Sequence, residues 1–92
     1  MEGGWVYVMT DEPGGVLYIG AAADLVSSVA RHRERAGSRD NLRRLVLVEP
    51  YPTIEEAFVR EKAMKKWRRA LKIELIERSN PGWHDLWDFI NG

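Results

Sequence analysis

The sequence predicts a small α/β domain, in which helices flank a three-stranded sheet and the elements follow the order ββαβαα. Three short runs of β-branched and aromatic residues have the composition of strands, and turn-forming residues separate the first two. Between and after these runs lie stretches that begin with helix-capping residues and space their apolar side chains with a helical period. This succession of strands and helices is typical of α/β folds.

The first two strands are expected at 5–9 and 16–20. A four-residue loop at 11–14 would close the hairpin and set Tyr7 directly opposite Tyr18. The aliphatic side chains of both strands would then share the other face, which we expect to be the core face. This register predicts two neighbouring phenols on the face away from the core.

A helix is expected to begin after Asp24, a preferred N-cap residue, and to run to about Ala36, with Gly37 as its stop. The third strand follows at 45–48 and is expected to end at the two prolines that come next. These elements add the last strand of the sheet and a helix to cover it.

Two further helices complete the predicted fold. A capping box of Thr53 and Glu56 opens the first helix, which is expected to reach Trp67 or Arg68. The second covers 70–78 and is ended by an Asn-Pro-Gly sequence. We expect the short segment after it to form a turn that packs two indoles back onto the domain.

Composition narrows the possible functions of the chain, which we expect to form one domain over 1–92. It is 45% hydrophobic and 30% charged, with a formal net charge of zero. The absence of cysteine excludes disulfides, thiolate metal sites and cysteine nucleophiles. Apolar runs are too short to span a membrane and the N-terminus does not read as a signal peptide, so we expect a cytoplasmic protein without a membrane partner. The balanced charge does not favour strong nonspecific nucleic-acid binding.

Charge is unevenly distributed along the chain. Residues 1–24 contain acidic side chains and neither Lys nor Arg, whereas 60–72 are rich in Lys and Arg and contain one acid, Glu61. Such a basic run is either a solvated helix face or a surface that binds nucleic acid.

Glu61 does not fit a simple packing explanation. On its helix it points in nearly the same direction as Ile54, Ala57 and Phe58, which mark the apolar side. A carboxylate that faces a core is costly unless another group compensates its charge. Either Glu61 lies at the edge of the core and pairs with Lys65, or it binds a cation such as Mg²⁺ in a cleft.

Tyr7, Tyr18 and His32 also allow two interpretations. Cross-strand aromatic pairs commonly do no more than stabilise a sheet, and a lone helical histidine is usually structural. Alternatively, the two phenols and the imidazole line a site.

Taken in order, these features resemble the GIY-YIG nucleases. The segment 5–7 stands where the family has Gly-Ile-Tyr, and Tyr18-Ile19-Gly20 matches the second motif literally. The resemblance continues over nearly the whole chain to its tail, which is similar to that of the small stand-alone bacterial members. It runs through Asp24-Leu25, His32, Leu45-Val46, Glu61, Lys65-Lys66-Trp67-Arg68-Arg69 and Asn80-Pro81-Gly82-Trp83.

The resemblance implies a metal-dependent DNA endonuclease that hydrolyses phosphodiester bonds with one divalent ion, Mg²⁺ or Mn²⁺, and no organic cofactor. Carried over to this chain, the catalytic residues are Tyr7, Tyr18 and His32, and the metal ligand is Glu61. The side chains expected to bind DNA are Arg35, Lys62, Lys65, Lys66, Arg68 and Arg69.

The chain departs from the family at one functional position. The family carries an arginine four residues before His32, and here that residue is Ser28. A serine cannot replace a bidentate phosphate clamp, so cleavage is expected to be weakened and Ser28→Arg to restore it. Alternatively, Arg31 or Arg35 replaces the family's arginine if its side chain reaches the site. Arg31 points about 60° away from Ser28 on a regular helix.

Three functions therefore remain open. The first is a metal-dependent endonuclease, weakened at position 28. The second is a catalytically inactive module of the same fold that binds nucleic acid or a protein partner through its basic helix. The third is a structural module that binds a partner through 83–87.

Overall fold

The computed structural model describes residues 3–35 and 42–92 and contains an antiparallel sheet of three strands. These are β1 (Gly4–Thr10), β2 (Leu17–Ala22) and β3 (Arg44–Tyr51), with β1 in the middle. The predicted α/β class with a three-stranded sheet flanked by helices is confirmed.

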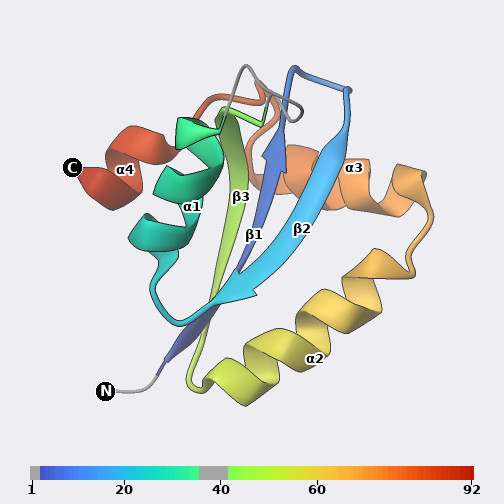
Figure 1. The fold of residues 1–92 in the computed structure, drawn as a ribbon. Coiled ribbons are helices and arrows are strands. Elements are labelled where there is room, and N and C mark those ends of the chain that lie inside the picture. The colour runs from blue at the N-terminus through green and yellow to red at the C-terminus, as the bar shows by residue number, and fades with distance from the viewer. Residues whose placement is uncertain (1–2, 36–41) are drawn as a thin grey trace.

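The helices lie on both faces of this sheet (Figure 1). One face is covered by α1 (Leu25–Glu34) and α4 (Trp87–Asn91), the other by α2 (Ile54–Lys65) and α3 (Arg69–Ser79). The order ββαβαα is observed, with α4 added where only a turn was expected. Within the described ranges, no helix has the length and apolar character needed to cross a membrane.

The loop of the β1–β2 hairpin is longer than predicted. Thr10 pairs with Leu17, so the loop spans 11–16 instead of four residues. The Asp11 carboxylate accepts backbone N–H groups within this loop, including that of Val16 at 2.9 Å. These bonds stabilise the wider loop and explain why the four-residue expectation is wrong.

The longer loop shifts the register of the two strands by two residues. Tyr7 pairs with Gly20 and Tyr18 pairs with Met9, so the prediction that the tyrosines are directly opposite is wrong. Side chains alternate with a period of two along a strand. An even shift therefore leaves both phenols on the same face, as diagonal neighbours.

Both faces of the sheet are buried, which corrects the prediction of one core face. On the α2–α3 side, Val8 of β1 packs in one cluster with Met64 and Ile76. On the α1–α4 side, Met9 packs in a second cluster with Val29. The middle strand thus carries apolar side chains in both directions, as expected for a sheet with helices on both faces.

Two predicted boundaries change in the structure. β3 continues through Pro50, because an edge strand tolerates a residue that lacks an N–H group. α2 ends at Lys65, short of the predicted end, and α3 starts at Arg69. The rest of the α2 prediction holds, since Thr53 Oγ1 accepts the backbone N–H of Glu56 at 3.2 Å.

Asp24 caps α1 as predicted, and its carboxylate accepts the backbone N–H of Ser27 at 3.1 Å. The predicted end of this helix at Ala36 and Gly37 lies outside the described residues. The cap fixes where α1 begins, and therefore which of its side chains face the sheet.

The segment after α3 is attached to β3 and α1 by two side chains. Asn80 Nδ2 donates to the carbonyl of Val46 at 3.2 Å. Asp85 accepts the backbone N–H of Leu45 at 3.1 Å and forms an ion pair with Arg33 at 2.8 Å. These contacts fix α1 and β3 relative to each other.

The two indoles of this segment pack inward, as expected. Trp83 is buried, and its ring N–H donates to Glu77 at 2.7 Å. Trp87 packs against the α1-side cluster, with the Arg33 guanidinium 4.8 Å from its ring centroid. Because Trp83 is buried and Trp87 is half-buried, neither indole is fully exposed for the predicted partner-binding role of 83–87.

Candidate active site

Three elements bring Tyr7, Tyr18 and His32 together: β1, β2 and α1 supply one residue each. Tyr7 Oη lies 3.4 Å from His32 Nε2. The ring centroid of His32 lies 4.5 Å from that of Tyr18, and the two tyrosine centroids lie 6.3 Å apart. We call these three residues the aromatic cluster.

Gly20 makes room for the aromatic cluster. A Cβ atom at this position would lie 2.6 Å from both Cζ and Oη of Tyr7 and 3.0 Å from Cε2 of Tyr18. The Tyr7 ring therefore lies across the backbone of its cross-strand partner, at a distance that only a residue without a side chain permits.

The two tyrosines differ in environment. Tyr7 is 3% exposed, whereas Tyr18 is 37% exposed at the edge of the sheet. Burial, followed by the nearby Tyr18 phenol, raises the pKa of Tyr7 from 10.0 to about 12. Tyr7 is therefore a neutral phenol at physiological pH and can donate a hydrogen bond, while Tyr18 is the more accessible of the two phenols.

Arg31 extends back toward the aromatic cluster. Its Nη2 donates to Ser28 Oγ at 3.2 Å, and its positive charge favours the ionised form of Tyr7. The hydroxyl of Ser28 also bonds to Tyr7, which lowers the pKa of Tyr7 and partly offsets burial. The length of the side chain thus overcomes the angle that separates positions 28 and 31 on the helix.

Glu61 approaches the cluster from α2. It lies one turn from Ala57 and from Met64, both buried, and its side chain is 20% exposed. Its charge contributes to the raised pKa of Tyr7. Lys65 Nζ lies 3.1 Å from its carboxylate. The predicted pairing of Glu61 with Lys65 is observed, and the Glu61 carboxylate also lies within electrostatic range of Tyr7.

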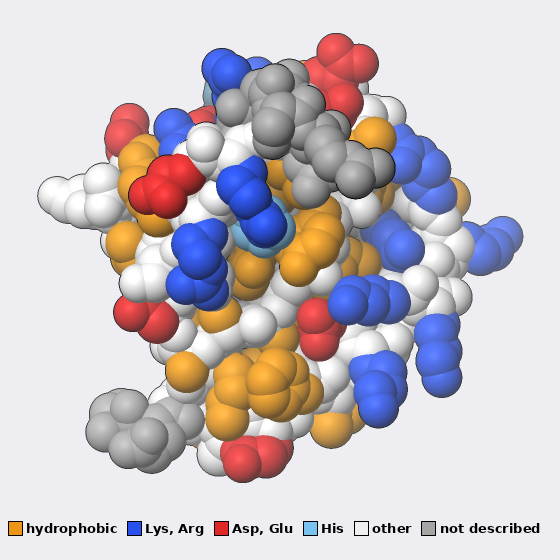
Figure 2. Space-filling model, in the orientation of Figure 1, with side chains coloured by type: hydrophobic (Ala, Val, Ile, Leu, Met, Phe, Trp, Pro, Cys, Tyr) orange, Lys and Arg blue, Asp and Glu red, His pale blue; other side chains and the backbone are white. Residues whose placement is uncertain are grey.

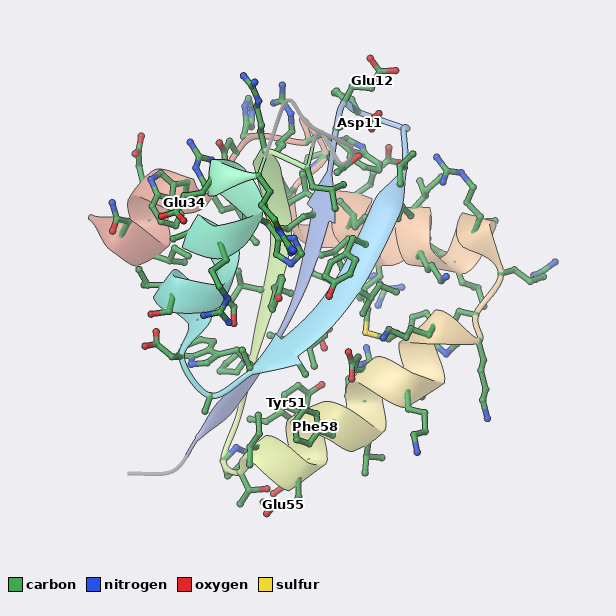
Figure 3. All side chains as sticks on the ribbon, in the orientation of Figure 1. Asp11, Glu12, Glu34, Tyr51, Glu55 and Phe58 are labelled. Carbon is green, nitrogen blue, oxygen red and sulfur yellow. The ribbon has the colours of Figure 1, made fainter. Side chains whose placement is uncertain are left out.

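The apolar direction of α2 differs from the prediction at one residue. Phe58 is 50% exposed and projects to the outside (Figure 3), while Ala57 and Met64 are the buried side chains of this helix. On a regular helix Glu61 points about 40° from Ala57 and about 60° from Met64, which places it at the edge of the buried side of α2.

Metal binding depends on the donors that surround Glu61. Among residues 3–35 and 42–92, no three His, Asp or Glu side chains lie close enough together to hold an ion. The site does not fit a cation held by protein ligands alone. It fits a divalent ion that keeps most of its waters and binds one carboxylate, as Mg²⁺ commonly does.

A sequence model of the GIY-YIG catalytic domain matches residues 3–74. The chain belongs to the GIY-YIG family. The match spans all three strands, α1 and α2, and ends within α3. Nucleases of the GIY-YIG family generally depend on a divalent metal ion and act on nucleic acid. No curated protein and no solved structure matches the chain significantly.

From the resemblance, Ser28 was interpreted only as the loss of the family's arginine, and the contact between Ser28 and Arg31 was not predicted. A signal for it was present, because residues three apart are neighbours on a helix surface. Arg35 is the exposed C-cap residue of α1, and its backbone N–H bonds to the carbonyl of Arg31 at 3.2 Å. Of the two arginines considered, Arg31 is the one with a described contact at position 28.

The basic side chains predicted to bind DNA do not form one uniform set. Lys and Arg gather along the side of the molecule where α2 meets α3 (Figure 2). Arg69 donates to the carbonyls of Gly14 and Gly15 and so ties α3 to the hairpin loop. Lys65 is held by Glu61. The other exposed cations of the predicted set are Lys62, Lys66 and Arg68, which lie beside them, and Arg35, which lies at the end of α1.

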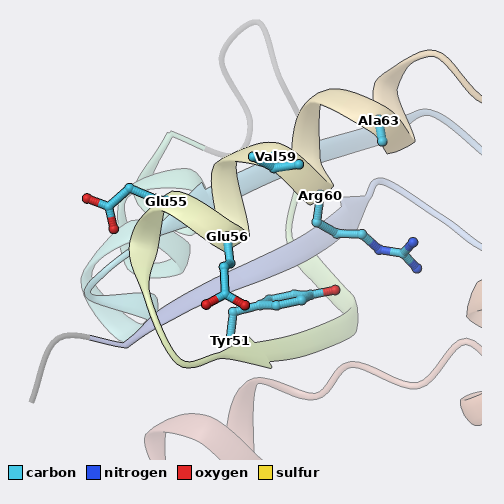
Figure 4. Close-up of a pocket in the computed structure, with 6 residues that line it drawn as sticks. All are labelled: Tyr51, Glu55, Glu56, Val59, Arg60 and Ala63. Carbon is cyan, nitrogen blue, oxygen red and sulfur yellow. The ribbon is translucent and has the colours of Figure 1, made fainter.

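A hollow of about 460 Å³ lies beside α2 and over the Tyr51 ring, and it shares no residue with the aromatic cluster (Figure 4). The guanidinium at its rim, that of Arg60, is engaged by both carboxylate oxygens of Glu49, at 3.0 and 3.2 Å. Arg60 thus serves the packing of α2 on β3, and the aromatic cluster remains the candidate active site. The hollow is lined by Tyr51, Glu55, Glu56, Val59, Arg60 and Ala63.

Proposed function

We propose that residues 1–92 form one GIY-YIG domain that hydrolyses phosphodiester bonds of DNA with a single divalent ion, Mg²⁺ or Mn²⁺. The observation that carries the proposal is the aromatic cluster itself, with a guanidinium and a carboxylate in electrostatic range of its buried phenol. Phenol, imidazole, guanidinium and carboxylate together supply the groups that metal-assisted hydrolysis of a phosphate ester requires.

Glu61 and Arg31 have complementary roles in this proposal. The Glu61 carboxylate would hold the ion, which supplies charge stabilisation to the phosphate and to the leaving oxygen. Arg31 would bind the non-bridging oxygens, whose negative charge grows in the transition state. Lys65 must release Glu61 when the ion binds, and it is then free to contact the DNA backbone.

Tyr7 and His32 would handle the proton of the attacking water. A phenol with a pKa near 12 is a poor base by itself. Tyr7 Oη can instead accept the proton of water while it passes its own proton to His32 Nε2, 3.4 Å away. This concerted shift avoids a free phenolate, and the more exposed Tyr18 would orient the water or the phosphate.

A cleavage assay tests this function directly. Purified protein is mixed with single-stranded, duplex and branched DNA in the presence of Mg²⁺ or Mn²⁺. We expect cleavage by the wild type, none by Glu61→Ala, and unchanged cleavage by Glu55→Ala, which removes an exposed carboxylate from the same helix. A folded wild type that cuts none of these substrates contradicts the proposal.

A second function is favoured by two observations at the same residues. Ser28 replaces the family's arginine, and Lys65 occupies the carboxylate that would bind metal. Both suit an inactive module that binds nucleic acid or a protein partner through its basic helix. DNA binding measured by fluorescence anisotropy, without cleavage under any metal condition, supports this second function. The cytoplasmic location of the protein stays a prediction.

A further inference from the structure

Four polar side chains are buried in the described part of the chain, and they differ in structural role. Thr10 bonds to the carbonyl of Glu12 in the hairpin, and Asn80 anchors the tail. The other two, Ser28 and His32, lie at the aromatic cluster. The proposed function gives His32 a role and gives Ser28 none, although a buried hydroxyl is retained only where its hydrogen bonds are satisfied.

We propose that Ser28 is a positioning residue, whose hydroxyl holds the Arg31 guanidinium beside Tyr7 and directs the Tyr7 proton toward His32. The inference rests on the proposed function, because it assigns the way in which Arg31 and Tyr7 of that site are kept in place.

For the His32 tautomer whose Nε2 carries no proton, the donor and acceptor inventory gives this chain of bonds one consistent direction. A guanidinium only donates, so Ser28 Oγ accepts from Arg31 at 3.2 Å. The single proton of the Ser28 hydroxyl is then available to the oxygen of Tyr7. The proton of Tyr7 is left for His32 Nε2, at 3.4 Å. The bonds therefore run from Arg31 through Ser28 and Tyr7 to His32, the direction that the concerted proton shift needs.

Ser28 also decides between two partners for Arg31. Hydrogen bonds from Ser27 lower the pKa of Asp24, the N-cap carboxylate of the same helix, and the charge of Arg31 adds a smaller lowering. The guanidinium is therefore attracted both to Asp24 and to the Tyr7 side. Arg31 is exposed, whereas Ser28 is 8% exposed and lies beside Tyr7. A hydrogen bond that the guanidinium donates to this buried, fixed hydroxyl holds it on the Tyr7 side. Without that hydroxyl, the Asp24 carboxylate is the competing site.

Kinetics on four variants test the inference. We expect Ser28→Ala to lower kcat about tenfold, the effect of misplacing one charged hydrogen-bond donor, with little change in KM. Ser28→Thr keeps the hydroxyl and should retain most of the rate. Ser28→Ala combined with Arg31→Ala should lose less rate than the product of the two single losses, because part of the effect of Ser28 passes through Arg31. Independent, multiplying losses in the double variant would overturn the inference.

A second readout does not require cleavage. The Nε–Hε NMR signal of Arg31 reports whether its guanidinium is ordered, and its shift on titration with inorganic phosphate reports anion binding. We expect Ser28→Ala to disorder this signal and weaken the phosphate response, and Ser28→Thr to preserve both. An unchanged signal in Ser28→Ala refutes the inference even if the enzyme is active. The expected NMR pattern in a protein that cuts no DNA upholds the role of Ser28 and refutes the proposed function.

Discussion

Tyr7 has a protonation state that is set by its burial in the middle strand. Its pKa of about 12 in the folded protein lies above the 10.0 of an ordinary phenol, so the unfolded chain loses the proton first as pH rises. The contribution of Tyr7 to stability is constant below pH 10 and falls between pH 10 and 12, by about 2–3 kcal/mol in all. Denaturant unfolding at pH 8 and 11.5 should show a larger loss for the wild type than for Tyr7→Phe. Equal losses would contradict this.

Ser28→Arg has a different expected outcome once the position of Arg31 is known. The sequence alone favours a gain in cleavage, because it restores the family's arginine. In the structure, Arg31 already contacts position 28, so a second guanidinium there would repel the first. We expect no increase in the single-turnover rate from Ser28→Arg alone. The exchange Ser28→Arg with Arg31→Ser should be faster than Arg31→Ser alone, and a large gain from the single variant would show that Arg31 does not serve the site.

Residue types and their order predicted which side chains meet at the site, but not how Arg31 takes part. Tyr7, Tyr18, His32 and Glu61 were named from their patterns and from the family resemblance. The fold brings the three aromatic side chains into contact and places Glu61 within electrostatic range of Tyr7. Arg31 depends on the conformation of a long side chain, which helix angles do not specify. The position of its guanidinium is set by a hydrogen bond to the hydroxyl of Ser28, a residue that the sequence alone marks only as the loss of the family's arginine.

Among the elements, the segment after α3 joins α1 to β3 through Asp85. Asp85 lies where burial raises its pKa, but the hydrogen bond from Arg33 and those from backbone amides outweigh burial and lower it. The ionised form is therefore stabilised by folding, and this contribution is lost as pH falls below the ordinary value near 4. We expect Asp85→Asn to be less stable than the wild type at pH 7 by about 1–2 kcal/mol and to lose less between pH 6 and 3. Thermal unfolding at both pH values measures this, and parallel losses would refute it.

Element types were predicted well, while element ends and register were not. The strands and the three longer helices follow from composition and capping residues such as Asp24 and Thr53. The hairpin register depended on bonds made by Asp11, which composition does not reveal. α4 is a five-residue helix, too short for a periodic pattern to develop.

The whole molecule has no net charge, so DNA binding depends on where its cations gather. Lys65 is held by Glu61, which makes Lys62 and Lys66 the better test of the α2 surface. We expect the double change of Lys62 and Lys66 to Ala to weaken DNA binding and to reduce the slope of log affinity against log salt by about 1–2. Arg78→Ala, at the other end of α3, is the matched control. Unchanged binding by the lysine variant would mean that this face is only solvated.

The contacts of Asn80 and Asp85 with β3 and α1 affect how much of the chain is needed to graft this domain onto another protein. The segment that matches the GIY-YIG family model, 3–74, contains every candidate catalytic group, yet Asn80 and Asp85 lie beyond it. A chimaera that grafts only this segment onto another protein would lack the fastening between β3 and α1, the helix that presents Arg31 and His32. A functional chimaera should include the chain at least through α4, so the segment that must be grafted is longer than the segment matched by the family model.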